Sequence, residues 1–145
     1  MYKKIMVPVD GSEKAATAAI HGAELASKLG SELLLFHVVP SLPPYVDPSP
    51  DRLSNIQQVI IDEFSKHGRE ILDKVKDDLE PYGLNIITDI AVGHPAEEIV
   101  KKAKEAECDL VVMGSRGLGE IKGYLLGSVS NRVTRHAACP VLVVR

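Results

Sequence analysis

The chain has 145 residues, of which 45% are apolar and 26% are charged, and its formal net charge is −3. This length predicts one domain, spanning residues 1–145, around a single buried core. The acidic balance argues against nucleic acid as a partner, because non-specific binding to it needs a broad basic surface. The first apolar run is too short for a signal peptide or a membrane span, so we expect a cytoplasmic protein with no membrane contact.

Short apolar runs alternate with longer amphipathic segments, which is typical of strand–helix units around a parallel sheet. We predict strands at residues 4–9, 33–39, 84–92, 109–113 and 141–144. A first helix is capped by Ser12 and closed by Gly30, a second spans residues 52–82, a third begins at Pro95 and a fourth near Ser128. Residues 40–51 hold five prolines, which predicts an irregular loop between the second strand and the second helix. The expected fold class is α/β, an open five-stranded parallel sheet flanked by helices and Rossmann-like.

The segment after the fourth strand carries a spaced set of glycines. Gly114-Ser115-Arg116-Gly117 is followed, nine residues later, by Gly127-Ser128-Val129-Ser130. Glycines beyond a strand let the backbone turn sharply and approach a ligand, because no Cβ intervenes. Backbone N–H groups at the start of the following helix, together with the two serine hydroxyls, are suited to bind phosphate.

The charges of this segment support an anion site. Residues 114–136 contain four basic side chains, Arg116, Lys122, Arg132 and Arg135, against the single acidic Glu120, a local balance of +3. Ligands of open parallel sheets lie beyond the carboxyl ends of the strands, where the winding direction reverses. If the strand order is 3-2-1-4-5, an assumption that periodicity does not test, this crevice lies between the ends of strands one and four.

The spacing G-x2-G-x9-G-[S/T] from Gly114 to Ser128 resembles the signature of the ATP-binding universal stress proteins. The resemblance extends to the segment from Lys3 to Ser12, to Leu35-Phe36-His37-Val38, to Val92-Gly93-His94-Pro95 and to the terminal Cys139-Pro140-Val141-Leu142-Val143-Val144. It implies an adenine-nucleotide-binding protein that acts as a stress-response or regulatory module. It also implies a homodimer paired through the strand at residues 141–144, an edge that suits an isologous contact.

The same resemblance implies where the nucleotide lies. Adenine and ribose are expected near the ends of the first two strands, the middle of the ligand near the end of the fourth strand, and the phosphates on the final glycine–serine turn. ATP, AMP or a related adenine nucleotide is the expected ligand, with Mg²⁺ as a companion ion. The site residues so implied are Pro8, Val9, Asp10, Val38, Met113, Gly114, Arg116, Gly117, Gly127, Ser128, Val129 and Ser130.

Several assignments keep an alternative. Asp10 either faces the ligand or only caps the first helix, and we favour the first. His37 lies in an apolar strand and is more simply a hydrogen-bonded core histidine than a catalytic base. Cys108 and Cys139 are interpreted as packing residues. The sequence has no nucleophile, base and orienting group at a spacing that indicates a catalytic site. A slow Mg²⁺-dependent ATPase is therefore the enzymatic alternative to a binding protein. A flavodoxin-like FMN carrier is a weaker alternative, since the chain lacks a phosphate loop rich in Ser and Thr after its first strand.

Overall fold

The protein, described by a computed structural model over residues 1–41, 50–117 and 126–145, is built on a parallel sheet of five strands. The strands are β1 (Lys4–Pro8), β2 (Glu32–Pro40), β3 (Ile86–Gly93), β4 (Leu110–Gly114) and β5 (Val141–Val144). Their order in the sheet is β3-β2-β1-β4-β5, and each neighbouring pair is parallel. The α/β fold class and the assumed strand order are confirmed, and the winding direction reverses between β1 and β4.

Four α-helices connect the strands: α1 (Glu13–Leu29), α2 (Pro50–Asp78), α3 (Pro95–Glu105) and α4 (Ser128–His136). Ser12 caps α1 as expected, because its Oγ accepts a hydrogen bond from the backbone N–H of Ala15 at 3.2 Å. Gly30 ends α1 in the left-handed conformation, with φ +71°. Both boundaries follow from residues whose local chemistry favours a helix end.

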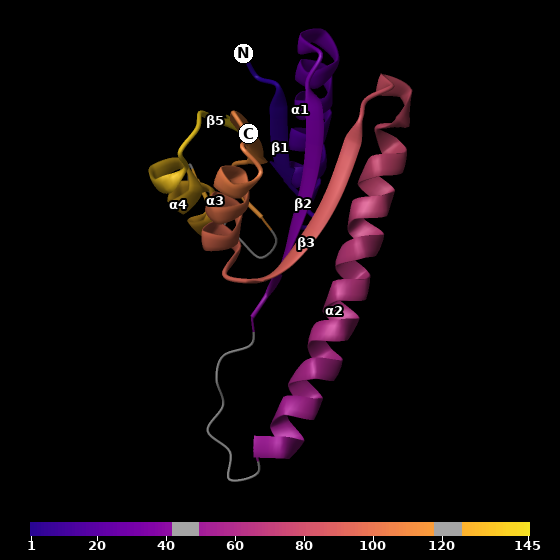
Figure 1. The fold of residues 1–145 in the computed structure, drawn as a ribbon, viewed down its shortest axis with the longest axis vertical. Coiled ribbons are helices and arrows are strands. Elements are labelled where there is room, and N and C mark those ends of the chain that lie inside the picture. Colours follow the sequence, from indigo (N-terminus) through magenta and orange to yellow (C-terminus); the bar gives the residue numbers. More distant parts are fainter. Residues whose placement is uncertain (42–49, 118–125) are drawn as a thin grey trace.

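The helices cover both faces of the sheet, as Figure 1 shows for α2 on one side and α3 and α4 on the other. Alternate residues of each strand point to opposite faces. Ile5, Val7, Leu33 and Leu35 therefore belong to one hydrophobic cluster, which includes buried alanines of α1, Leu72 of α2 and Leu79 just after α2. Met6, Leu34, Phe36 and Val111 belong to a second cluster, which includes Ile99 of α3 and Val133 of α4.

Several predicted boundaries are corrected; β1, β2 and β4 differ from the prediction by one residue at one or both ends, and the larger differences are as follows. The second helix ends at Asp78 rather than residue 82, and a 3₁₀ turn (Glu80–Tyr82) follows, because Pro81 cannot supply the N–H that an α-helix needs. The third strand begins at Ile86, two residues later than predicted. The proline-rich segment is shorter than residues 40–51, since Pro40 ends β2 and Pro50 begins α2, where the first helical turn tolerates a proline. Residues 42–49 lie outside the described residues.

An ion pair fastens α3 to the edge of the sheet. The Nζ of Lys102 donates a hydrogen bond to Oδ2 of Asp89 on β3, and Oδ1 of Asp89 accepts the backbone N–H of Ile90 at 2.8 Å. Burial raises the pKa of Asp89, but the two hydrogen bonds and the charge of Lys102 outweigh it, and the pKa is lowered overall. The carboxylate of Asp89 on β3 therefore stays ionised and pairs with Lys102 of α3.

Candidate functional site

The turn from β1 into α1 is held by the side chain of Asp10. Its Oδ1 atom accepts a hydrogen bond from the backbone N–H of Ser12 at 2.9 Å. Gly11, between them, has φ +88°, a left-handed conformation that glycine adopts without steric cost. Asp10 thus stabilises the turn, and it also lines the pocket described below. The alternative that Asp10 caps α1 is wrong, because Ser12 is the N-cap, and the ligand-facing role of Asp10 stays a prediction.

The two glycines that follow β4 each allow a close approach. A Cβ at Gly114 would lie 2.9 Å from Cβ and 3.0 Å from the carbonyl oxygen of Lys14, at the start of α1. A Cβ at Gly117 would lie 2.5 Å from Oδ2 of Asp10. A side chain at position 114 would therefore displace the main chain of Lys14, and one at position 117 would displace the Asp10 carboxylate. The first half of the signature therefore packs the end of β4 against the β1–α1 turn.

The start of α4 is tied back to the end of β4 through one carbonyl oxygen, that of Ser115. This oxygen accepts the backbone N–H of Gly127 at 2.6 Å and the hydroxyl of Ser130 at 2.7 Å. Ser130 is 2% exposed. Its hydroxyl proton is used inside the protein rather than facing outward as the expected phosphate donor, which differs from the sequence-based interpretation. The N-terminus of α4 is consequently fixed beside Gly114 and Ser115.

A pocket of about 470 Å³ opens at the carboxyl ends of β1, β2 and β4. Ten of the twelve residues expected at the site line it: Pro8, Val9, Asp10, Val38, Met113, Gly114, Arg116, Gly117, Val129 and Ser130. Gly127 and Ser128 do not line it and lie directly before Val129, at the N-cap and first position of α4. The structure thus brings residues separated by more than a hundred positions to one crevice.

One wall of the pocket was not anticipated. Phe64, His67 and Ile71 of α2 line it, and so do Pro95 and Ile99 of α3. Helical spacing indicates only that apolar residues such as Phe64 and Ile71 share one face of α2. It does not show that the face reaches past the sheet to the strand ends, where these side chains meet the pocket.

His37 links this wall to the end of β1. Its Nδ1 atom lies 2.8 Å from the carbonyl oxygen of Val9, and the ring is 8% exposed. Because a carbonyl oxygen only accepts, Nδ1 carries the proton of this hydrogen bond. Gly68 of α2 lies against the other side of the ring, where a Cβ would be 2.4 Å from Cδ2 of His37. The prediction of a hydrogen-bonded core histidine is confirmed, although the ring also lines the pocket.

The main chain of Val38 faces the pocket beyond the end of β1. The N–H of Glu32 donates to Lys3 and the carbonyl of Phe36 accepts from Val9, whereas the N–H of Leu33 donates to Asn85 on the other side. Even-numbered residues of β2 therefore direct their N–H and carbonyl groups toward β1. Because β1 ends at Pro8, it does not extend alongside Val38. The backbone N–H of Val38 therefore presents a donor to the pocket, and its carbonyl oxygen presents an acceptor.

The basic side chains of the segment do not all converge on the pocket, which corrects the charge argument. Arg116 lines it. Arg132 instead lies 3.9 Å from Glu97 of α3, and Arg135 is an exposed residue of α4 that does not line the pocket. Neither Arg132 nor Arg135 lines the pocket, because both lie on the exposed side of α4, away from the buried Ser130. Lys122 and Glu120 lie outside the described residues.

Other candidate groups lie away from this pocket. Cys108 is buried in the cluster beneath α3 and α4, and Cys139 packs against the same cluster, as predicted. Burial raises the pKa of the Cys108 thiol to about 11 and also raises that of Cys139. Within the described ranges, no three His, Cys, Asp or Glu side chains converge as metal ligands would. In the same ranges, no helix is long and apolar enough to cross a membrane.

The order of the strands and the position of the crevice place the chain among the doubly wound α/β proteins. The model of the universal stress protein family matches residues 1–145. Universal stress protein MJ0531 of Methanocaldococcus jannaschii is 39% identical over all of this chain and 83% of its own length. The chain belongs to the universal stress protein family.

Solved structures agree with this membership. The universal stress protein UspA from Lactobacillus plantarum superposes with a TM-score of 0.89 at 28% identity, covering 99% of this chain and 98% of its own. A universal stress protein in complex with cAMP superposes with a TM-score of 0.69 at 27% identity, covering 99% of this chain and 97% of its own.

Proposed function

We propose that the pocket at the ends of β1, β2 and β4 binds an adenine nucleotide, with ATP as the expected ligand. The observation that carries the proposal is that this one pocket joins the main-chain edge of Val38 to Arg116 and the first turn of α4. A volume of about 470 Å³ is within the range of small-molecule sites. A related universal stress protein is known in complex with cAMP, which supports a ligand with an adenine ring.

The base belongs at the β2 end of the pocket. Adenine offers an acceptor, N1, beside a donor, the 6-amino group, and the main chain of Val38 presents a donor and an acceptor. Guanine carries a donor at N1 and an acceptor at position 6, so the order of its groups is reversed. Side chains of Val9, Val38 and Met113 supply the apolar surface on which the ring would lie. The edge of Val38 therefore provides the base preference.

The phosphates belong at the α4 end. The first N–H groups of a helix have no carbonyl partner within that helix, and the positive end of the helix dipole favours an anion. The amide of Gly127 is bonded to the Ser115 carbonyl, so the amides of Ser128, Val129 and Ser130 and the guanidinium of Arg116 are the groups we assign to phosphate. Asp10 is the carboxylate that lines the pocket in the described part of the chain, and we assign it to the Mg²⁺ that accompanies ATP.

Titration calorimetry with ATP tests this assignment. We expect Arg116→Ala to weaken ATP binding by about tenfold or more, because a charge-assisted hydrogen bond is lost. Arg135→Ala is the matched control, since it removes the same charge from an exposed position of α4 outside the pocket. Gly127→Val should also weaken binding by more than about tenfold by crowding the first turn of α4. No binding of ATP to the unaltered chain, or equal losses for both arginines, would refute the proposal.

The base assignment has its own test. ATP, AMP and cAMP should compete for one site, whereas GTP should bind at least about tenfold more weakly, because the Val38 edge cannot pair with guanine in the same pose. Equal affinity for ATP and GTP would show that the Val38 edge does not select the base. Mass spectrometry of the ligand that co-purifies with the protein identifies the physiological nucleotide among the adenine compounds.

We also propose that the protein is a cytoplasmic homodimer, paired through β5, in which nucleotide occupancy regulates a stress response. β5 is an edge strand of the sheet, and such an edge presents unpaired backbone groups. The carbonyl groups of Pro140 and Val144 accept bonds from β4, so the backbone of Val141 and Val143 faces outward. Val143→Pro removes an outward N–H without touching the β4 ladder, and light scattering should then report a monomer. A Val143→Pro chain that stays dimeric would exclude pairing through β5.

A further inference from the structure

A second, smaller hollow lies between α3 and α4, on the side of these helices that faces away from the nucleotide pocket. Its volume is about 240 Å³, and its lining residues come from both helices: Ala96, Glu97, Val100, Lys101, Arg132 and His136. We call it the α3–α4 groove. Neighbouring residues of the same helices, Ile99 and Val129, line the nucleotide pocket instead. The two helices therefore separate two cavities.

The α3–α4 groove is cationic although the chain as a whole is not. Lys101 and Arg132 contribute two positive charges against the single acidic side chain of Glu97. The net charge of the whole chain is −3. Arg132 and Glu97 are 3.9 Å apart and more than half exposed, so the pair is weak and leaves the arginine able to take another partner.

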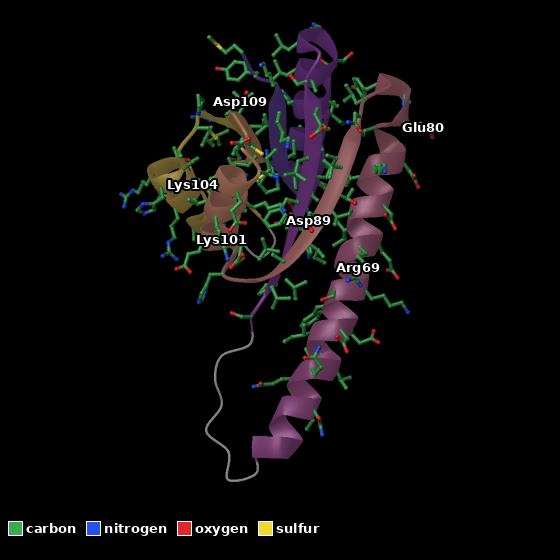
Figure 2. All side chains as sticks on the ribbon, in the orientation of Figure 1. Arg69, Glu80, Asp89, Lys101, Lys104 and Asp109 are labelled. Atoms are coloured by element: carbon green, nitrogen blue, oxygen red, sulfur yellow. The ribbon has the colours of Figure 1, made fainter. Side chains whose placement is uncertain are left out.

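Other basic residues extend this charge along both helices. Lys104 is exposed one turn beyond Lys101 on α3, and Arg135 is exposed beside His136 on α4. Figure 2 shows Lys101 and Lys104 on the α3–α4 side of the sheet and Arg69 on the opposite side, on α2. Lys102, by contrast, is engaged with Asp89. Besides Lys101 and Arg132 of the groove, α3 and α4 thus carry two more exposed basic residues, Lys104 and Arg135, and the exposed acidic Glu105.

The lining of the α3–α4 groove combines this charge with apolar surface. Ala96 and Val100 line the groove together with Lys101 and Arg132, and both also pack in the cluster that holds α3 against the sheet. A rigid apolar base with basic groups on two sides suits a chain segment that carries carboxylates around one apolar side chain. A polyanion such as RNA would instead need a broad positive field, which an acidic chain and Glu97 oppose.

We propose that the α3–α4 groove is the docking site for an acidic segment of a partner protein. Carboxylates of the segment pair with Lys101 and Arg132, and its apolar side chain lies on Ala96 and Val100. The site does not depend on the nucleotide assignment, since its lining residues are not those of the nucleotide pocket. The α3–α4 groove is thus the surface by which the protein would recognise an acidic partner.

The probe is a fluorescein-labelled short polyglutamate peptide with one central leucine, and the measurement is fluorescence anisotropy. The variant Lys101→Glu/Arg132→Glu reverses the charge of the groove and should weaken binding by more than about tenfold. The matched control, Arg69→Glu/Lys74→Glu, makes the same change of charge on exposed positions of α2 and should stay within about twofold. A peptide with serine in place of leucine should bind several-fold more weakly. Equal losses in the two variants would mean that only overall charge matters and would overturn the proposal.

Two further measurements locate the site and identify its ligand class. In ¹⁵N-labelled protein, the unlabelled peptide should shift the amide signals of Val100, Lys101 and His136, and shifts centred elsewhere would contradict docking in the groove. Single-stranded DNA of equal charge should compete poorly, and equally tight binding of DNA would reassign the surface to nucleic acid. ATP affinity should be unchanged in Lys101→Glu/Arg132→Glu, so a failure of this proposal is distinguishable from a failure of the nucleotide assignment.

Discussion

The carboxylate of Asp10 occupies the space that a side chain at position 117 would need, since a Cβ built on Gly117 would lie 2.5 Å from Oδ2. The same carboxylate accepts the N–H of Ser12 through its other oxygen. The β1–α1 turn and the loop after β4 are therefore fitted to each other at van der Waals distance. Gly117 in the signature thus has a packing reason, which does not itself involve a ligand.

Gly117→Ala should accordingly disturb the site through Asp10. We expect ATP affinity to fall by more than about tenfold, because the carboxylate and the loop cannot both keep their positions. Asp10→Ala and the double variant complete a cycle, and their effects on affinity should be far from additive, since one contact underlies both. The measurement is titration calorimetry on all four proteins. Additive losses would show that Gly117 and Asp10 act independently.

Gly68→Ala should destabilise the fold even though alanine favours a helix. The new methyl group would meet Cδ2 of His37 at 2.4 Å and Cδ1 of Ile90 at 3.0 Å. Overpacking of this kind costs about 1–3 kcal/mol, whereas the gain in helix propensity is about 1 kcal/mol. We therefore expect urea unfolding to show a net loss of about 1 kcal/mol. Ser65→Ala, one turn earlier and without such a contact, is the control and should be neutral or slightly stabilising.

Ser130→Ala should cost about 1–2 kcal/mol of unfolding free energy, since it removes a buried hydroxyl that donates to the Ser115 carbonyl at 2.7 Å. Thr134→Ala is the matched control, because its hydroxyl bonds the Ser130 carbonyl of the same helix from an exposed position. That change should stay within about 0.5 kcal/mol. Equal effects of the two substitutions in chemical denaturation would exclude a special role for the link between Ser130 and Ser115.

The thiol of Cys108 should resist alkylation at pH 8. Burial raises its pKa from 9.0 to about 11, which lowers the thiolate fraction about a hundredfold relative to the unfolded chain. Because the folded state holds this proton more tightly, its contribution to stability is lost as pH rises above about 9. Iodoacetamide kinetics on Cys139→Ser protein, folded and in urea, measure the difference. Similar rates in both states would contradict the raised pKa.

The architecture was predictable because its signals are local. The near-continuous apolar runs of buried parallel strands, the cap at Ser12 and the left-handed Gly30 each depend on a few adjacent residues. Errors at helix and strand ends include those near Pro40, Pro50 and Pro81, where a proline is compatible with more than one structure, and the start of β3 at Ile86. Periodicity could not order the strands, which needed a topological assumption that the sheet has now confirmed.

The candidate site was predictable only where residues belong to a motif. Ten expected residues line the pocket, but the wall formed by Phe64 and His67 comes from a helix far away in sequence, and no spacing rule connects it to the glycines. The prediction that the basic residues gather at the anion site is wrong for Arg132 and Arg135, because proximity in sequence does not determine the direction of a side chain on a helix. The sequence-based assignment of the Ser130 hydroxyl to phosphate differs from the structure, because residue type alone does not show which group a hydroxyl bonds.

The length of α2 has a kinetic consequence. Its 29 residues span about 43 Å, and Figure 1 shows its first part extending past the ends of the strands. Residues 55–67 include no buried side chain, whereas Gly68, Leu72 and Leu79 are buried. Local melting of a helix segment costs least where it has few tertiary contacts, and helices open and re-form within about a microsecond. Phe64 and His67 lie at the end of this stretch, so local melting of α2 there would move two lining residues of the pocket while the sheet keeps its packing.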